Sequence, residues 1–536
     1  MHIGYRGEET LPDPSDERLA PALDGGSPEP VLTAARPRVS RWQLAAVTVI
    51  AVGVAVRFAA RSNMWLDEVL SVNIARLPLG EIPDALRRDG APPLYYLLLH
   101  GWTAVVGTGT LAVRALSGIF ALAALPLIWV AGRRVGGRAT AHAALVLLAA
   151  SPFAVRYSTE ARMYSMLVVL ALAGWLLFDD LLKRFSWPRA GALALLTGAA
   201  LLTHYWSFYL LAVATGAACW HARRGPQRAE ARRVLATLGA GCALFLPWLP
   251  SFVYQLRHTG TPWARPAGVK VLFDTPFQFV GGLWDPGFIL GLVAWGLIAL
   301  ALLGRPLDGR RVELDLRIRP EGRALAVAAF GTLGVGIVAG LITQAAFAVR
   351  YTAILFPFVV LLVALGTSRF VDPRVYRGVL ALAVVLGGIA MVPGVFGERT
   401  TAPKVARVLN AEARPGDVVA YCPDQLGPSV HRLLDARGLV QLTFPTAGPP
   451  DRVDWVDYGD RNRAARVAPF TQMLLDRAGP DHDIWLVWSP GYRTFSTKCS
   501  AMADLLEETR PEMTRRVKVS TRYFEHPGLI RFEPSR

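Results

Sequence analysis

Two adjacent acids, Asp67 and Glu68, follow the first long apolar segment and are the residues of this chain best suited to chemistry. Carboxylates at a membrane boundary are costly to desolvate, so they usually serve a function there. One interpretation is a general base that takes a proton from an acceptor hydroxyl, with or without a divalent metal. The other is a solvated pair at the N-terminus of a helix over residues 69–76, where acids are favoured. Position alone leaves both interpretations open.

A second polar segment, residues 156–164, lies between two apolar segments and is suited to binding a phosphate. The guanidinium groups of Arg156 and Arg162 can each donate two parallel hydrogen bonds to a phosphate, and Glu160 could orient one of them. Tyr164 ends the segment and could line the same pocket. The alternative is an anchor of arginine and tyrosine side chains at the membrane interface.

Two shorter motifs stand at the ends of apolar segments. Arg350, followed by Tyr351, could clamp a lipid phosphate, or its side chain could simply extend to the lipid headgroups. His204 and Tyr205 could line a sugar pocket, although an aromatic belt at the interface is the favoured interpretation there. The sequence has no group of histidines and cysteines with metal-ligand spacing.

These residues must be positioned by membrane helices. The chain has 536 residues, of which 53% are hydrophobic, and its mean hydropathy of +0.34 is too high for an ordinary soluble protein. Several apolar runs approach the roughly 20 residues that cross a bilayer. We expect a polytopic α-helical protein with eleven spans, at 42–60, 111–131, 139–155, 163–182, 190–204, 206–221, 233–250, 288–303, 324–343, 352–368 and 378–396.

The net charge of +16 is explained by membrane orientation, and we expect no nucleic-acid partner. The arginines gather in loops between apolar segments, where they favour the cytoplasmic side and meet anionic lipid headgroups. All five arginine-rich loops face the cytoplasm only if the N-terminus is cytoplasmic and residues 93–107 do not cross. That stretch is short for a span and suits an interfacial helix. The same parity places the polar motifs and the C-terminal part on the outer face.

Three parts of the chain differ in composition. Residues 1–38 are polar and rich in Pro, Gly, Asp and Glu, which predicts a disordered cytoplasmic tail. Residues 39–399 contain the apolar segments, and residues 400–536 form a small extracytoplasmic α/β domain. The expected strands of this domain are 417–421, 484–488 and 529–532, and its expected helices are 402–413 and 429–436. Cys422 and Cys499 could form a disulfide if the domain is extracytoplasmic.

Taken together, the motifs resemble the integral-membrane (GT-C) glycosyltransferases of the protein O-mannosyltransferase and lipid A aminoarabinose transferase group (glycosyltransferase family 39-like). The matching pieces are Trp65–Glu68, Pro92–Tyr96, Ser158–Tyr164, Thr203–Tyr205 and Arg350-Tyr351 followed by Pro357. The resemblance implies a polyprenyl-phosphate sugar as donor and Asp67 as the base. It also implies that Glu68 is a supporting acid or metal ligand and that Arg350 and Arg162 hold the donor phosphate. One departure is Ala91, where the family often has His.

The function we expect is inverting transfer of a sugar, with mannose as the first choice, at the outer face of the cell membrane. The acceptor hydroxyl belongs to a protein, a glycan or a glycolipid. A transporter or lipid flippase is the first alternative, and it predicts acids and Gly/Pro breaks near the bilayer midplane. The second alternative is a non-catalytic scaffold that displays the C-terminal domain.

Overall fold

The computed structural model describes residues 40–260, 266–283, 286–308, 311–344 and 347–534, so the expected tail at 1–38 lies outside the described residues. The chain divides into two compact units after Leu44. Of the first unit, the described residues form the start of helix α1 (Arg41–Val56). Ser40 and Gln43 form a reciprocal capping box there, each side-chain oxygen accepting from the other's backbone N–H at 3.2 and 2.8 Å.

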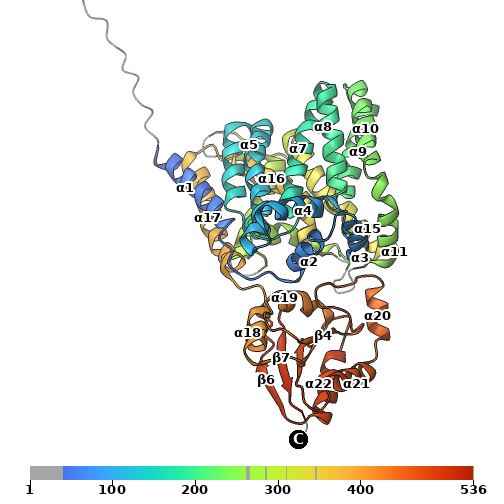
Figure 1. Cartoon of the computed structure of the whole chain (residues 1–536). Coiled ribbons are helices and arrows are strands. Elements are labelled where there is room, and N and C mark those ends of the chain that lie inside the picture. Colours follow the sequence, from blue (N-terminus) through green and yellow to red (C-terminus); the bar gives the residue numbers. More distant parts are fainter. Residues whose placement is uncertain (1–39, 261–265, 284–285, 309–310, 345–346, 535–536) are drawn as a thin grey trace, which may run out of the picture. The chain divides into compact units, whose positions relative to one another are not determined.

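The second unit begins with a large helical part, coloured blue to light orange in Figure 1. Besides α1, its helices are α2 (Leu66–Ala75), α3 (Ile82–Asp89), α4 (Leu94–Val106), α5 (Thr110–Ala149), α6 (Pro152–Ser158), α7 (Tyr164–Lys183), α8 (Trp187–Leu201), α9 (Ser207–Arg224), α10 (Arg228–Ala243), α11 (Leu249–His258), α12 (Lys270–Phe279), α13 (Pro286–Leu303), α14 (Pro320–Ala326), α15 (Thr332–Thr343), α16 (Phe356–Thr367) and α17 (Pro373–Phe396). Short helical turns lie at Leu246–Trp248, Val327–Gly331 and Val349–Ile354, and β1 (Gly304–Pro306) pairs antiparallel with β2 (Val312–Leu314).

Each of the eleven expected spans contains helix in this structure. Within the described residues, six helical stretches are long and apolar enough to cross a membrane: 110–149, 164–183, 228–258, 286–303, 320–343 and 373–396. The protein is therefore a multi-pass membrane protein, while the exact number of spans and their orientation stay predictions. Helix α4 has 13 residues, about 20 Å at 1.5 Å per residue, and α16, which lies in an expected span, has 12, so it stays a prediction that α4 does not cross.

Helix α5 contains two of the expected spans as a tight hairpin. Its regular geometry breaks at Gly136 and at Gly137, whose φ of +76° is a conformation that favours glycine. The two arms then run close together, because a Cβ added to Gly132 would lie 2.6 Å from the Cα of Ala141. Arg134, at the turn, pairs with Asp180 of α7 at 2.7 Å.

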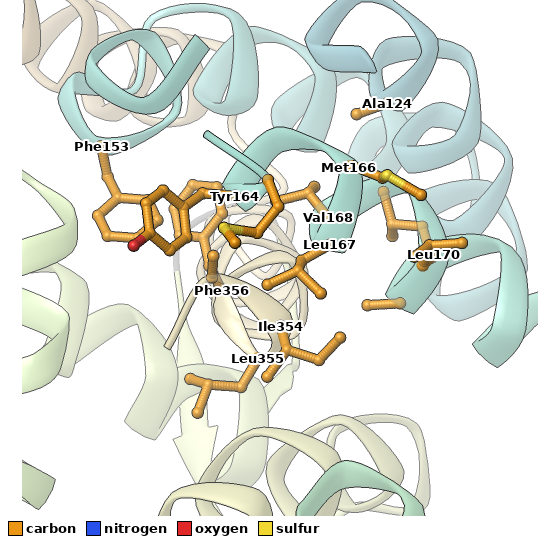
Figure 2. Packing of buried hydrophobic residues seen from close by; sticks show 14 of the residues in the cluster. Ala124, Phe153, Tyr164, Met166, Leu167, Val168, Leu170, Ile354, Leu355 and Phe356 are labelled. Atoms are coloured by element: carbon orange, nitrogen blue, oxygen red, sulfur yellow. The ribbon is translucent and has the colours of Figure 1, made fainter. Parts of the chain in front are cut away.

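The core of the helical part forms where α6, α7 and α16 meet. Figure 2 shows Phe153 and Tyr164 beside Phe356 and the aliphatic side chains of α7. The rings of Phe153 and Phe356 lie 4.8 Å apart, and both are buried. Tyr164, one of the expected pocket residues, is therefore anchored in the apolar core through its ring.

The C-terminal domain, orange to red in Figure 1, has a five-stranded sheet in the order β4-β3-β5-β7-β6. Its strands are β3 (Val418–Cys422), β4 (Val440–Thr443), β5 (Ile484–Trp488), β6 (Met513–Val517) and β7 (Gly528–Phe532). Its helices are α18 (Ala402–Glu412), α19 (Gly427–His431), α20 (Tyr458–Ala464), α21 (Val467–Ala478) and α22 (Lys498–Thr509), with a short turn at Asp424–Leu426. Strand β3 runs parallel to β4 and β5, and β7 is antiparallel to β5 and β6.

The sheet has a helix layer on each face, as expected for an α/β domain. Helix α18 packs Val405 and Leu409 against one face, and α21 and α22 pack Leu474 and Met502 against the other. The three expected strands are present, whereas β4 and β6 were not predicted from the sequence. Cys422 and Cys499 form a disulfide that joins β3 to α22 across 77 residues. Closing a loop of that length lowers the entropy of the denatured state, which stabilises the fold by about 4.5 kcal/mol at room temperature.

Candidate active site

Asp67 lies in the first turn of α2, a helix that starts at Leu66 after the extended residue Trp65. Its carboxylate oxygen Oδ2 is 3.3 Å from Nη2 of Arg350, and the two side chains are 16% and 13% exposed. Arg350 lies in the short helical turn Val349–Ile354, and its guanidinium is also 5.7 Å from the ring of Trp65. The helix start agrees with the second interpretation of the acid pair, but Asp67 is paired and mostly buried rather than solvated, and its role as a base stays a prediction.

Arg162 approaches the same residue from the segment between α6 and α7. Its Nη1 donates to Ser71 Oγ at 2.9 Å, to Tyr96 Oη at 3.2 Å and to the Asp67 carbonyl at 3.4 Å. Within the part of the chain that the structure describes, its Nε is buried and has no hydrogen-bond acceptor. Asp67, Arg162 and Arg350 are thus brought together from positions far apart in the sequence.

Glu68 is fully buried and has a different set of partners. Both of its oxygens accept from Arg114 of α5 at 2.7 Å, and Oε1 also accepts from the Ala161 N–H at 3.0 Å. Arg399 lies 3.7 Å from Oε2. Burial alone would raise the pKa of Glu68, but the Arg114 guanidinium more than offsets this effect and holds that pKa below its usual value. These contacts occupy the carboxylate, so we correct the expected role of Glu68 as a catalytic acid or metal ligand to a structural one.

Arg156 and Glu160 belong to the same buried charge network. Arg156 Nη2 pairs with Glu160 Oε1 at 2.9 Å, and Arg399 lies 3.8 Å from the same oxygen. Arg156 also donates to the carbonyl of Gly394 in α17 at 3.4 Å. The expectation that Glu160 orients an arginine agrees with this geometry. The expected roles of Arg156 as a phosphate ligand and Glu160 as a pocket residue do not, because Arg156 contacts Glu160 and Gly394, and Glu160 contacts Arg156 and Arg399.

Aromatic residues border the Asp67, Arg162 and Arg350 cluster. The ring of His204 lies 5.1 Å from that of Tyr351 and 6.2 Å from that of Tyr164. The guanidinium of Arg350 is 5.7 Å from the Tyr351 ring. The rings of His204 and Tyr351 therefore lie beside Arg350, while that of Tyr164 is buried in the core, and their place in a substrate pocket stays a prediction.

Tyr205 differs from its neighbour His204. Its hydroxyl donates to Gln255 of α11 and accepts from Trp248 Nε1 at 3.0 Å. Its ring packs 4.8 Å from Phe252. We therefore correct its expected place in the substrate pocket, since its contacts lie within the packing of α11.

Comparison with known proteins gives the fold and a partial family match. Residues 90–250 match the family model described as dolichyl-phosphate-mannose-protein mannosyltransferase. The apo crystal structure of ArnT from Cupriavidus metallidurans is 14% identical, covers 91% of this chain and 97% of its own, and has a TM-score of 0.56. The resemblance to GT-C glycosyltransferases of the PMT/ArnT type is confirmed.

The structure of the same ArnT bound to undecaprenyl phosphate is 13% identical, covers 91% of this chain and 98% of its own, and has a TM-score of 0.55. An Archaeoglobus fulgidus oligosaccharyltransferase complexed with Zn and sulfate is 12% identical, covers 82% and 68% of the two chains, and has a TM-score of 0.46. No curated protein matches the chain. The two ArnT structures cover 91% of this chain, so the similarity in fold extends well beyond residues 90–250, which the family model matches.

The charges around Asp67 in this GT-C fold do not suit a divalent metal. Among the described residues, no group of three or more His, Cys, Asp and Glu side chains could hold an ion. Asp67 is paired with Arg350, and Glu68 is held by Arg114 and Arg399. A cation would have to displace these guanidinium groups, so the residues present do not fit the metal that the sequence left open.

Asp89 is a residue of this site that sequence reasoning missed. Tyr96 Oη donates to Asp89 Oδ2 at 3.2 Å and accepts from Arg162, so an acid supports the arginine through a tyrosine. Burial raises the pKa of Asp89 to about 6. Acids are common in polar segments, so nothing in the sequence distinguished Asp89 as a site residue. Arg114 and Arg399 were missed as well, although a lone arginine inside the apolar segment 111–131 was a usable signal for Arg114.

Proposed function

We propose that the protein transfers a sugar from a polyprenyl phosphate to an acceptor hydroxyl at the outer face of the membrane. The observation that carries this proposal is that Asp67, in the first turn of α2, contacts both Arg162 and Arg350. A carboxylate can accept a proton while nearby guanidinium groups bind a phosphate. The undecaprenyl phosphate in the similar ArnT structure supports a donor of this class.

The reaction is a single displacement. Asp67 accepts the proton of the acceptor hydroxyl, and the hydroxyl oxygen forms a bond to the anomeric carbon from the face opposite the phosphate. The bond between that carbon and the phosphate oxygen breaks, and its electron pair leaves with the polyprenyl phosphate. Arg350 and Arg162 stabilise the charge that develops on this leaving group. The configuration at the anomeric carbon is therefore inverted, and no nucleotide is needed.

The proposed sugar is mannose, and the proposed acceptor group is a hydroxyl. The name of the matched family favours mannose as the sugar. The acceptor is the hydroxyl of a protein, a glycan or a glycolipid. The Cys422–Cys499 disulfide supports an extracytoplasmic C-terminal domain, because such bonds persist in oxidising compartments. With eleven spans in the cell membrane, the N-terminus is then cytoplasmic.

No observation on the described residues favours the transporter alternative. The acids Asp179 and Asp180 lie in the last turns of α7 and pair with Lys183 and Arg134. A transporter would place such acids in a cavity near the bilayer midplane. The scaffold alternative leaves the convergence of Asp67, Arg162 and Arg350 without a purpose.

The test is a transfer assay on the purified full chain. The donors are radiolabelled polyprenyl-phosphate mannose and, in parallel, polyprenyl-phosphate aminoarabinose, with a cell-envelope extract as the source of acceptors. We expect transfer by the wild type and none by Asp67→Asn. The matched control is Asp84→Asn, an exposed acid of α3 in the same loop, which should transfer normally. Undiminished transfer by Asp67→Asn would remove Asp67 from the mechanism.

A further inference from the structure

Helix α2, which carries Asp67, has no side-chain cap of its own. The residue at its N-cap position is Trp65, which makes no capping hydrogen bond. The N–H groups of Glu68 and Val69 both bond to the Trp65 carbonyl, at 3.0 and 3.1 Å. The N–H groups that precede these two, those of Leu66 and Asp67, have no acceptor within the helix and need one from elsewhere. The start of α2 therefore depends on groups outside the helix.

Glu525 of the C-terminal domain is held rigidly beside this helix. It lies between β6 and β7, and it is 3% exposed. Its N–H donates to the Arg399 carbonyl and its carbonyl accepts from the Thr401 N–H, both at 3.0 Å. Its Oε1 accepts from Ser429 Oγ at 2.8 Å. These bonds fix Glu525 to the linker between α17 and α18 and to α19.

The carboxyl of Glu525 lies close to the first turn of α2, because the preceding residue, Phe524, packs against Trp65. Burial raises the pKa of Glu525 to about 7, the hydroxyls of Thr400 and Ser429 and the N–H of Leu66 lower it, and Asp67 raises it. Its Oε2 is buried and accepts no hydrogen bond from the described residues. A carboxyl at this place stabilises the N-terminal end of the helix, where the backbone N–H groups point outward.

The neighbouring residues of the two segments are also in contact. The ring of Phe524 packs edge-on against Trp65, with centroids 4.7 Å apart and planes at 80°. Trp65, Leu66 and Leu70 belong to one hydrophobic cluster with buried residues of the C-terminal domain, among them Phe495. The loop of Phe524 and Glu525 thus contacts the residues that directly precede Asp67.

We propose that Glu525 is a positioning residue, contributed by the C-terminal domain, that holds the first turn of α2 and with it Asp67 in place for transfer. The inference rests on the proposed function of Asp67 as the base. A displacement of about 1 Å of a reacting group can lower a rate on the order of 100-fold. This gives the C-terminal domain a part in the reaction, although it contains none of the groups that bind the donor.

The test compares Glu525→Ala with Glu525→Gln in the transfer assay. We expect kcat to fall at least about tenfold in the alanine variant, because Asp67 loses its position. The donor concentration for half-maximal transfer should stay within about twofold, because Arg162 and Arg350 are untouched. Glu525→Gln should retain most of the activity, since its amide oxygen still accepts a hydrogen bond. If the alanine variant does not fold, Glu525→Asp, which withdraws the carboxyl by one methylene, should lower kcat in the same way.

A second measurement does not depend on activity. Hydrogen exchange of the peptide covering residues 65–71 should be at least about tenfold faster in Glu525→Ala than in the wild type. The matched control is Asp424→Ala, which removes another buried carboxyl of the same domain, one whose hydroxyl partner is Tyr458 within that domain. The control should lower the unfolding temperature but leave kcat and this exchange unchanged.

An unchanged kcat in Glu525→Ala overturns the inference, and so does an equal loss of kcat in Asp424→Ala, which would show a general effect of the domain. A rise in the donor concentration for half-maximal transfer at constant kcat also overturns it, because Glu525 would then act on the donor site. If the wild type shows no transfer at all, the proposed function fails. The exchange measurement then still shows whether Glu525 holds α2.

Discussion

The guanidinium of Arg350 lies 3.3 Å from the carboxylate of Asp67, and both side chains keep a small exposed area. Without a donor, the proposed base is therefore held as an ion pair. The phosphate of a donor carries the charge that would attract Arg350 away from Asp67. Donor binding would then free the carboxylate to accept a proton, so that the base becomes available only when there is a sugar to transfer.

Replacement of Arg350 should weaken donor binding. We expect Arg350→Ala to bind undecaprenyl phosphate about 10- to 100-fold more weakly, because a hydrogen-bonded charge contact contributes about 1.5–3 kcal/mol. Arg350→Lys should lie in between, since it keeps the charge and loses the planar pair of donors. Titration of the purified variants with undecaprenyl phosphate measures this, with Arg87→Ala, an exposed arginine of α3, as the control. Equal affinities in all variants would show that Arg350 does not bind the phosphate.

Removal of one member of the Glu68–Arg114 pair should destabilise the helical part. Each of Glu68→Ala and Arg114→Ala leaves a buried charge without its partner, which typically costs about 3–5 kcal/mol. The exposed pair of Arg311 and Asp308, 2.8 Å apart, is the comparison, and its loss should cost less than about 1 kcal/mol. Unfolding temperatures in detergent measure both. A small effect of Arg114→Ala would mean that Arg399, 3.7 Å from Glu68, compensates for Arg114.

The C-terminal domain should lose stability as the pH rises from about 4 to about 7. Burial raises the pKa of Asp424 from 3.8 to about 7 in the folded state. Because the folded-state pKa is the higher one, the stabilising contribution is complete below pH 4 and is lost as the pH rises through about 7. Asp424→Asn should lack this loss, so its stability relative to the wild type should increase by about 2–4 kcal/mol between pH 4 and pH 8. If the free energy of unfolding of the wild type and that of Asp424→Asn differ by the same amount at every pH in this range, the raised pKa of Asp424 is contradicted.

The elements of the fold could be predicted where a local pattern determines them. Apolar runs of the right length predicted a helix in each expected span, and the stretch at 93–107 also forms a helix, α4, whose interfacial position stays a prediction. The buried strands at 418–422 and 484–488 have continuous apolar runs, which made them visible. The edge strand β6, Met513–Val517, has two arginines and an exposed face, so its sequence has no apolar pattern to reveal it.

The sequence by itself determined that Asp67, Arg162 and Arg350 are candidates, because acids and arginines beside apolar segments are costly without a function. Only the tertiary structure decided their partners. Glu68 is bound by Arg114 and Asp67 by Arg350, although the two acids are neighbours in the chain, because successive residues of a helix point in different directions. Contacts across hundreds of residues, such as that of Phe524 with Trp65, depend on how whole elements pack, and no local pattern encodes them.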